Sequence, residues 1–297
     1  MSKPTSASKP GPSSASIHDS LFIPGGPVGI LLAHSLGGSP ADVRYLAQNL
    51  ARAGFTVSCP LLAGHGPNRG KLAETTWWDW YASLEEAHDR LRAECDKVIV
   101  GGLSAGGVMT LHLAAKRSAG VDGIVLLSPT LWPDGWAVPW YFMFTRLIRH
   151  KWFANLLFYP EREPFGIKDE RVRRLVVNGM EQQGGGKFGF PGGVFQEFRW
   201  MVNAVKGGLG SLRQPTLIIH PREDDRSSLR NVLYLQSKLA GIVETVVLDD
   251  CYHVITLDKQ RDIVVDRLLG FTKRFATDVR KSAQGGAQIR FRSGAAE

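Results

Sequence analysis

The sequence predicts a protein of the α/β class, with a mostly parallel central sheet flanked by helices and a helical insertion. Two observations lead to this prediction. Short, almost continuously apolar runs alternate with segments whose apolar residues recur at helical spacing, and repeated units of this kind form parallel sheets. Between residues 130 and 205 the alternation stops, and five of the eight tryptophans fall in that stretch.

In the first part of the chain, strands and helices follow each other closely. Val28–Ala33 is continuously apolar, as expected of a strand buried on both faces, and the Gly-rich loop His34–Pro40 follows it. Ala41–Ala53 has apolar residues at helical spacing and ends before a glycine. Phe55–Cys59 is the next predicted strand, and Thr76–Ala93 is the next predicted helix.

The central part of the chain contains a motif that carries chemistry. The apolar run Val98–Val100 leads into Gly102, Ser104 and Gly106, and a predicted helix over Val108–Arg117 follows. These residues fit G-x-S-x-G in the strand–turn–helix context that a nucleophile elbow requires. The glycines lack a Cβ atom, which lets the strand and the helix pass closely around a serine in a strained turn.

After this motif the alternation continues, stops and resumes. Val121–Ser128 is a predicted buried strand, and the Trp-rich insertion follows it. The alternation resumes with the strand Thr216–His220, the helix Ser227–Ala240 and the strand Val243–Leu248. The last predicted helix is Asp258–Ala276.

These segments define the expected organisation of the chain. We expect a core formed by residues 21–129 and 206–278, with residues 130–205 inserted as a helical cap. Residues 1–20 are rich in Ser, Pro and Lys, and we expect a disordered arm there. Residues 279–297 are expected to form a disordered basic tail.

Composition is that of an ordinary globular protein. The chain has 297 residues, of which 43% are hydrophobic and 22% charged. The formal net charge is +8, but the basic residues are scattered, so we expect no nucleic-acid partner and at most a weak contact with a membrane surface. No run approaches the roughly twenty apolar residues of a membrane span, and no signal peptide is recognisable.

The cysteines and glycine-rich loops do not indicate a cofactor. The three cysteines are odd in number and lack metal-ligand spacing, which favours reduced thiols in a cytoplasmic protein. No carboxylate or histidine spacing suggests a metal site, and the glycine-rich loops match neither a phosphate-binding nor a dinucleotide-binding motif. The cysteines are Cys59, Cys95 and Cys251.

Two later loops contain the residue types that a serine nucleophile needs. A serine hydroxyl is a weak nucleophile near pH 7 and requires a base such as imidazole, which a carboxylate in turn orients. Asp224 and Asp225 follow the strand at residues 216–220, and His253 follows the strand at residues 243–248. The order Ser, acid, His is the one that accompanies a nucleophile elbow.

Several stretches resemble a known family over about residues 28 to 275. They are LLAHSLGGSPADVRYLAQNLARAGF, LLAGHG, TTWWDW, GLSAGG and HVITLD. The sequence is similar to the cap-bearing α/β-hydrolases, specifically to bacterial carboxylesterases that resemble monoacylglycerol lipases. HVITLD is the most specific of these stretches, because the catalytic histidine of that family begins a similar one.

The resemblance implies a role for each member of the site. Ser104 would be the nucleophile, His253 the general base and acid, and Asp224 the orienting carboxylate. Asp224 is favoured over Asp225 because the acid of the family lies two residues after an arginine, as Asp224 follows Arg222.

The oxyanion donors implied by the resemblance are the backbone N–H groups of Leu36 and Ala105. Leu36 lies two residues after His34, as in the His-Gly-aromatic loop of the family, and Ala105 directly follows the nucleophile. The sequence departs from the family pattern at two positions: Ser35 replaces the glycine of that loop, and Tyr252 replaces a small residue before the catalytic histidine.

The remaining histidines are not expected to take part in catalysis. His34 is expected to order its loop, and His65 is expected to stabilise the turn between two glycines. The others show no partner pattern and are expected to be surface or satisfied core residues. They are His18, His88, His112, His150 and His220.

The expected function is hydrolysis of a small-molecule carboxylic ester through an acyl-enzyme. The aromatic residues of the cap favour an apolar acyl chain, because they bury area without needing polar partners. Both small aliphatic esters and a monoacylglycerol fit this expectation. Two alternatives stay open: acyl transfer to an acceptor other than water by the same residues, and a non-catalytic protein that uses the fold as a ligand pocket.

Overall fold

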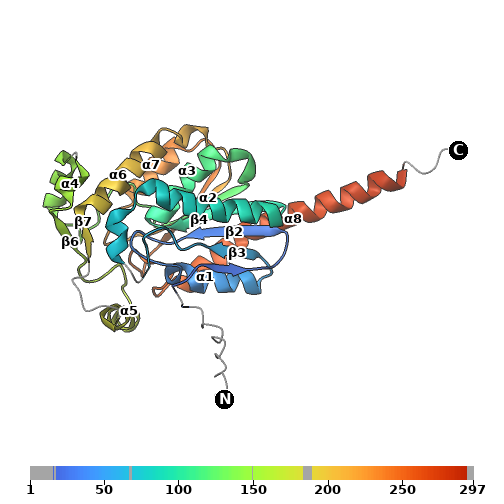
Figure 1. Cartoon of the computed structure of the whole chain (residues 1–297). Coiled ribbons are helices and arrows are strands. Elements are labelled where there is room, and N and C mark those ends of the chain that lie inside the picture. Colours follow the sequence, from blue (N-terminus) through green and yellow to red (C-terminus); the bar gives the residue numbers. More distant parts are fainter. Residues whose placement is uncertain (1–15, 17, 67–68, 149, 183–188, 293–297) are drawn as a thin grey trace, which may run out of the picture.

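The computed structural model describes residues 16, 18–66, 69–148, 150–182 and 189–292. In these residues a seven-stranded sheet has the order β1-β3-β2-β4-β5-β8-β9, and its strands are parallel except for β1, which is antiparallel to β3 (Figure 1). The strands are β1 (Leu21–Ile23), β2 (Val28–Ala33), β3 (Thr56–Cys59), β4 (Lys97–Leu103), β5 (Gly123–Leu127), β8 (Thr216–Pro221) and β9 (Val243–Leu248).

Helices cover both faces of the sheet (Figure 1). One face packs against α2 (Trp77–Glu94), α3 (Ala105–Lys116), α6 (Gly192–Lys206) and α7 (Arg230–Lys238). The other face packs against α1 (Ala41–Arg52) and α8 (Arg261–Arg292).

Strand β2 shows why the central strands are continuously apolar. Leu31 and Ala33 belong to the core on the α2 and α3 side, whereas Ile30 and Leu32 belong to the core on the α1 and α8 side. Successive side chains of a strand point to opposite faces, so a strand covered on both sides has no polar face. The structure thus confirms the predicted α/β class with a mostly parallel sheet.

Some elements differ from the prediction. Strand β1 was not predicted, because a three-residue strand is too short to show a period. Helix α3 begins at Ala105, three residues before the predicted start. Its first turn contains Gly106 and Gly107, which in the sequence resemble a loop but here allow close packing against the neighbouring backbone.

Helix α8 continues beyond its predicted end at Ala276. It extends to Arg292, through residues for which we expected a disordered tail, and projects from the body of the molecule (Figure 1). The stretch 277–292 contains no proline and several Ala, Gln, Lys and Arg residues, which favour a helix. Residues 293–297, and most of the predicted N-terminal arm (1–15 and 17), lie outside the described residues.

The insertion between β5 and β8 is mostly helical but also contains a small sheet. Strands β6 and β7 pair antiparallel, with Tyr159 opposite Phe190, although the sequence showed no clear strand there. Each has only three residues and contains a proline. The elements of the insertion are a 3-10 helix (Trp140–Leu147), α4 (Lys151–Ala154), β6 (Phe158–Pro160), α5 (Glu170–Gln182), β7 (Gly189–Pro191) and α6.

Helix α6 belongs to the core as much as to the insertion. It packs against α2 and α3 and buries Phe198, Met201 and Val205. The elements α4, β6 and β7 instead lie together at one end of the molecule, with α5 beside them (Figure 1). We use the word cap for residues 130–191, which precede α6.

The register brings five loops to the carboxyl edge of the sheet. The last residues of neighbouring strands pair: Ala33 with Gly102, Leu103 with Leu127, and Pro221 with Leu248. The loops that follow β2, β4, β5, β8 and β9 therefore open at the same edge. Ligand sites of open α/β sheets lie at this edge.

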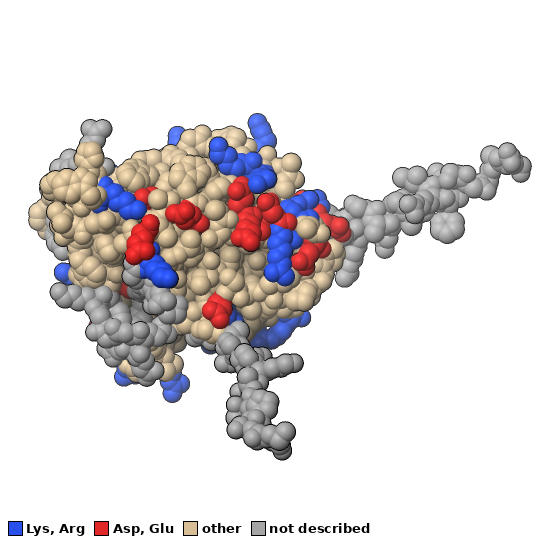
Figure 2. Space-filling model, in the orientation of Figure 1, with Lys and Arg blue, Asp and Glu red and all other residues tan. Residues whose placement is uncertain are grey.

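The molecular surface in view carries charges of both signs. Figure 2 shows acidic and basic side chains intermingled on this face. Ion pairs in the structure include Arg117 with Glu85 at 3.0 Å and Lys97 with Asp122 at 2.8 Å. Within the described ranges, none of the helices combines the length and the apolar character that crossing a membrane requires.

Candidate active site

Ser104 lies in a strained turn between β4 and α3. Its φ is 56° and its ψ is −120°, a conformation that residues other than glycine rarely adopt. A Cβ atom on Gly106 would lie 2.3 Å from the His34 carbonyl oxygen, and one on Gly102 would lie 2.6 Å from that of Ala33. The glycines therefore let the turn pack directly against the end of β2.

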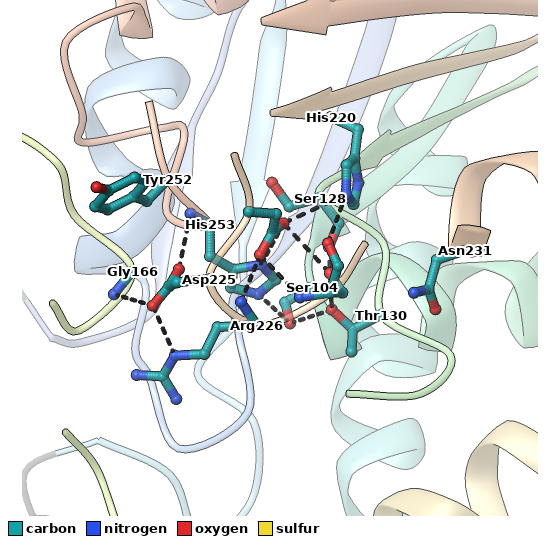
Figure 3. A network of polar contacts seen from close by, with 12 residues as sticks. Ser104, Ser128, Thr130, Gly166, His220, Asp225, Arg226, Asn231, Tyr252 and His253 are labelled. Carbon is teal, nitrogen blue, oxygen red and sulfur yellow. Dashed lines mark hydrogen bonds and ion pairs between the residues drawn. The ribbon is translucent and has the colours of Figure 1, made fainter. Parts of the chain in front are cut away.

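The structure brings Ser104, His253 and Asp224 together. Ser104 Oγ is 2.8 Å from His253 Nε2, and His253 Nδ1 is 3.0 and 2.9 Å from Asp224 Oδ1 and Oδ2. All three residues are buried. They come from the β4–α3 turn, the loop after β9 and the loop after β8, and Figure 3 shows Ser104 facing His253.

The surroundings of Asp224 favour its ionised form. Burial raises the pKa of Asp224, but the charge and hydrogen bond of His253 outweigh it, so that the pKa lies below its usual range. The carboxylate also accepts hydrogen bonds from the backbone N–H groups of Arg226 (2.7 Å) and Ser227 (2.9 Å). An ionised Asp224 only accepts hydrogen bonds, so His253 Nδ1 is the donor of this contact, and Nε2 is the ring atom that faces Ser104.

Asp225 contacts the histidine loop through the backbone and not through the imidazole. Its Oδ1 accepts from the N–H of His253 at 3.3 Å, and its Oδ2 accepts from the N–H of Gly166 at 3.0 Å and from Arg226 Nε at 3.3 Å (Figure 3). Gly166 belongs to the cap. Asp225 thus connects the cap to the loop that carries His253.

Asp258 makes a second connection of this kind. Its buried carboxylate accepts hydrogen bonds from the backbone N–H groups of Lys168 and Asp169 in the cap, and from those of Tyr252 and Lys259. Sequence reasoning singled out the stretch HVITLD for its histidine and missed its aspartate. The signal was present, because an aspartate that ends an otherwise apolar stretch needs buried donors.

His220 was not expected to have a specific partner, but it contacts the acid of the site. It is fully buried, and its Nε2 is 2.9 Å from the Ser227 carbonyl oxygen and 3.4 Å from Asp224 Oδ2. Burial lowers the pKa of His220, so the ring is neutral and Nε2–H is the donor. Its position at the end of β8, four residues before Asp224, is the only hint in the sequence.

Two hydroxyl groups adjoin the site as well. Thr130 Oγ1 lies 3.3 Å from Ser104 Oγ and 3.0 Å from Ser227 Oγ. Ser227 Oγ in turn lies 3.3 Å from Asp224 Oδ2. Sequence reasoning missed both residues, because Thr130 and Ser227 are distant in the chain.

The loop after β2 lies beside Ser104, and His34 holds it in place. Burial lowers the pKa of His34 to about 4, so the ring is neutral. Its Nε2 accepts from the N–H of Leu62 at 3.1 Å, and its Nδ1 therefore donates to the Ser35 carbonyl oxygen at 2.9 Å. The expectation that His34 orders its loop agrees with these contacts.

This contact also orients the N–H of Leu36. The carbonyl of Ser35 and the N–H of Leu36 belong to one planar trans peptide and point in opposite directions. By holding the carbonyl, His34 sets the direction of that N–H. Leu36 and Ala105 both line the cavity at Ser104.

The cavity above Ser104 is mostly apolar. Its volume is about 210 Å³. Polar groups in its wall include Ser104, His253, Thr130, Glu161 and Arg226. The aromatic part of the wall comes from the cap and α6, and consists of Phe142, Tyr159, Phe165, Phe190, Phe195 and Phe198.

The described residues contain no group of three or more His, Cys, Asp or Glu side chains placed to hold a metal ion. The three cysteines are buried and free. Burial raises the pKa of both Cys59 and Cys251 to about 12, which keeps these thiols protonated and unreactive.

Fold and site together define an α/β protein with a Ser–His–Asp arrangement at the carboxyl edge of a parallel sheet. A model of the alpha/beta hydrolase family matches residues 30–267, and the chain belongs to this family.

Individual relatives are similar over most of their length. A thermostable monoacylglycerol lipase from Bacillus sp. (strain H-257) is 29% identical over 252 residues, covering 84% of this chain and 92% of the relative. A carboxylesterase from Bacillus subtilis (strain 168) is 24% identical over 253 residues, covering 84% and 94%. A solved structure from work on LipS and LipT, two metagenome-derived lipolytic enzymes, is 26% identical with a TM-score of 0.73, covering 86% and 98%.

Proposed function

We propose that this chain hydrolyses carboxylic esters through an acyl-enzyme formed on Ser104. The observation that carries the proposal is the chain of contacts from Ser104 Oγ to His253 Nε2 and from His253 Nδ1 to both oxygens of Asp224. This arrangement activates a hydroxyl group for attack on a carbonyl carbon. The similarity to a monoacylglycerol lipase and a carboxylesterase supports the same chemistry.

In the acylation step, Ser104 Oγ attacks the ester carbonyl carbon while His253 Nε2 takes the hydroxyl proton. The imidazolium that forms is stabilised by the carboxylate of Asp224. As the tetrahedral intermediate collapses, the carbon–oxygen bond to the alcohol breaks, and His253 gives its proton to the departing oxygen. The acyl group then remains on Ser104.

The N–H groups of Leu36 and Ala105 are the donors we propose for the oxyanion of that intermediate. Ala105 is the first residue of α3, so its N–H has no acceptor within the helix. The start of a helix also favours negative charge. The loss of one such donor typically costs about 2.7–4 kcal/mol of transition-state stabilisation.

The cavity supports an acyl chain that is apolar and of short to medium length. Its wall is largely aromatic, and its volume of about 210 Å³ is smaller than the ~300–1,000 Å³ typical of pockets for drug-sized ligands. A small aliphatic ester fits this space better than one with a long acyl chain. The alcohol part of the substrate would lie toward Glu161, Arg162 and Arg226 at the polar part of the wall.

A contact of the cap with a lipid surface is a further part of the proposal. Large apolar side chains of the cap are exposed: Trp140, Trp152 and Leu156 are 76%, 64% and 71% accessible. Tryptophan is favoured where an apolar phase meets water. Such a contact would bring esters that are dissolved in a lipid phase to the cavity.

Turnover of p-nitrophenyl esters by the purified protein and by Ser104→Ala tests the function. We expect hydrolysis that is lost in the variant, with butyrate or hexanoate esters preferred over palmitate. A fluorophosphonate probe should label the wild type and not His253→Ala. Equal turnover by wild type and Ser104→Ala would refute the proposal, and ester products formed with added alcohols would indicate acyl transfer instead.

A further inference from the structure

A chain of hydroxyl groups connects Ser104 to Asp224 without passing through His253. It runs from Ser104 Oγ to Thr130 Oγ1 (3.3 Å), from there to Ser227 Oγ (3.0 Å), and from Ser227 Oγ to Asp224 Oδ2 (3.3 Å). With His253 on the other side, these contacts close a ring. All five residues are largely buried, and Ser104, Thr130 and His253 also line the cavity.

The number of protons in this ring determines which group can donate to Ser104. The carboxylate of Asp224 only accepts hydrogen bonds, so Ser227 donates its single hydroxyl proton to Asp224. The proton of Thr130 has three acceptors within reach: Ser227 Oγ, the Ser128 carbonyl oxygen at 3.3 Å, and Ser104 Oγ. Thr130 is therefore the hydroxyl of the ring that can turn toward Ser104 when the serine oxygen has no proton of its own.

We propose that Thr130 is a further catalytic residue, whose hydroxyl donates a hydrogen bond to Ser104 Oγ while the acyl-enzyme is hydrolysed. This inference rests on the proposed ester hydrolysis. In that step a water oxygen bonds to the acyl carbon and a water proton moves to His253 Nε2. The bond from the acyl carbon to Ser104 Oγ then breaks, its electron pair stays on Oγ, and the proton on His253 moves to Oγ. Thr130 stabilises the negative charge that develops on this oxygen.

The backbone around Thr130 is held from two sides, which keeps the hydroxyl in place. Ser128 has a positive φ of 45°, and its N–H donates to the Ile219 carbonyl oxygen at 2.8 Å. Asn231 on α7 accepts the N–H groups of Leu131 (2.9 Å) and Trp132 (3.1 Å) through its Oδ1. Figure 3 shows Thr130 between Ser104 and Asn231. A donor held by its surroundings acts without the cost of ordering it during the reaction.

The experiment measures the breakdown of the acyl bond by itself. A p-nitrophenyl carbamate transfers its carbamoyl group to the nucleophile, the excess reagent is removed, and the recovery of esterase activity gives the rate of hydrolysis of the carbamoyl-serine. We compare wild type with Thr130→Val, which keeps the shape but not the hydroxyl, and with Thr130→Ser, which keeps the hydroxyl. Thr272→Val is the matched control, because Thr272 is a fully buried threonine on α8 that bonds to the Leu269 carbonyl.

We expect recovery to be about threefold to tenfold slower in Thr130→Val, the range that one neutral hydrogen bond supplies. Thr130→Ser and Thr272→Val should recover at nearly the wild-type rate. Thr130→Ala is a second hydroxyl-free variant with the same expectation, for use if the valine variant does not fold. Equal recovery by wild type and the hydroxyl-free variants would overturn the inference, and so would a serine variant as slow as the valine variant.

Failure of the proposed function gives a different result. Mass spectrometry of the carbamoylated protein locates the adduct. An adduct on Ser104 with unchanged recovery in Thr130→Val refutes only the role of Thr130. A protein that hydrolyses no ester and takes up no carbamoyl group on Ser104 refutes the ester hydrolysis itself.

Discussion

Ser35 Oγ donates a 2.6 Å hydrogen bond to Asp42 Oδ2, which ties the loop after β2 to the first turn of α1. The N–H of Ser35 approaches the same oxygen at 3.4 Å. By the resemblance to the α/β-hydrolases, this loop is expected to have a glycine at the position of Ser35. The serine thus supplies a contact to the loop that glycine, with no side chain, does not make.

Removing this bond should loosen the proposed oxyanion donor. We expect Ser35→Ala and Asp42→Ala each to lower kcat more than they change KM, because the N–H of Leu36 acts on the transition state. A hydrogen bond to a charged group contributes about 1.5–3 kcal/mol. Steady-state kinetics gives kcat and KM of the variants, and urea unfolding gives the loss in free energy of unfolding. If the hydrogen bond between Ser35 and Asp42 is responsible, the double variant should lose little more activity and stability than either single variant. Fully additive losses would contradict this explanation.

His34 should make the stability of the protein depend on pH. Its pKa is about 4 in the folded protein and near 6.5 when unfolded, so between these values the unfolded chain binds a proton that the folded chain does not. Stability is therefore lost as the pH falls from 6.5 to 4, by about 3 kcal/mol for this one group. Urea unfolding at several pH values should show a flatter dependence in His34→Gln. An unchanged slope would mean that His34 is protonated when folded.

Asp258→Asn should destabilise the protein and reduce its activity. Both carboxylate oxygens of Asp258 accept hydrogen bonds from four backbone N–H groups, whereas the side-chain amide of asparagine has only one oxygen that accepts. Some of these buried N–H groups would therefore lose their acceptor. Asp250→Asn is the matched control, because Asp250 lies in the same region but pairs at the surface with Lys168 and Lys259. Thermal unfolding and kcat should change clearly in the first variant and little in the second.

His220→Leu should lower kcat, because Asp224 loses a neighbouring N–H group and the Ser227 carbonyl loses its donor. His220→Gln keeps an amide donor of similar reach and should retain more activity. We expect a loss of about threefold to tenfold for the leucine variant. The prediction is tested by measuring kcat/KM of both variants, with circular dichroism to check that each is folded. Equal loss in both would point to packing rather than hydrogen bonding.

Lipid contact should depend on the exposed side chains of the cap. Trp152→Ser together with Leu156→Ser should reduce co-sedimentation with phosphatidylcholine vesicles, because burial of apolar area drives such binding. Hydrolysis of a water-soluble p-nitrophenyl ester should stay unchanged. Ile242→Ser, at an exposed position before β9, is the control and should leave vesicle binding unaltered. Binding that does not respond to the cap substitutions would exclude this surface.

The parts that could be predicted from sequence are those with a local signal. The run 28–33 is recognisable as a strand because both of its faces are buried, which makes it continuously apolar. The turn at Ser104 is recognisable by the glycines of G-x-S-x-G, which its close packing requires. Strands β6 and β7 could not be predicted, because three residues show no period and their pairing joins residues about thirty positions apart.

The unpredicted part of the site depends on distant contacts. Thr130 and Ser227 are 97 residues apart in the chain, and neither belongs to a motif. In the sequence, His220 is a single histidine at the end of a strand. Its contact with Asp224 exists because the loop after β8 places that carboxylate beside the ring. Side chains of this kind become recognisable only when the carboxyl ends of β5 and β8 lie side by side.

The two buried aspartates at the base of the cap set a condition for engineering. Asp225 and Asp258 accept hydrogen bonds from the backbone N–H groups of residues 166, 168 and 169, so much of the junction between the cap and the histidine loop depends on the main chain. The side chain of Lys168 adds an ion pair with Asp250 at 3.0 Å. A chimera that receives a foreign cap must therefore reproduce the path of the main chain over these residues. The cap side chains that line the cavity, such as Phe142 and Tyr159, are then the ones to exchange in order to change the substrate.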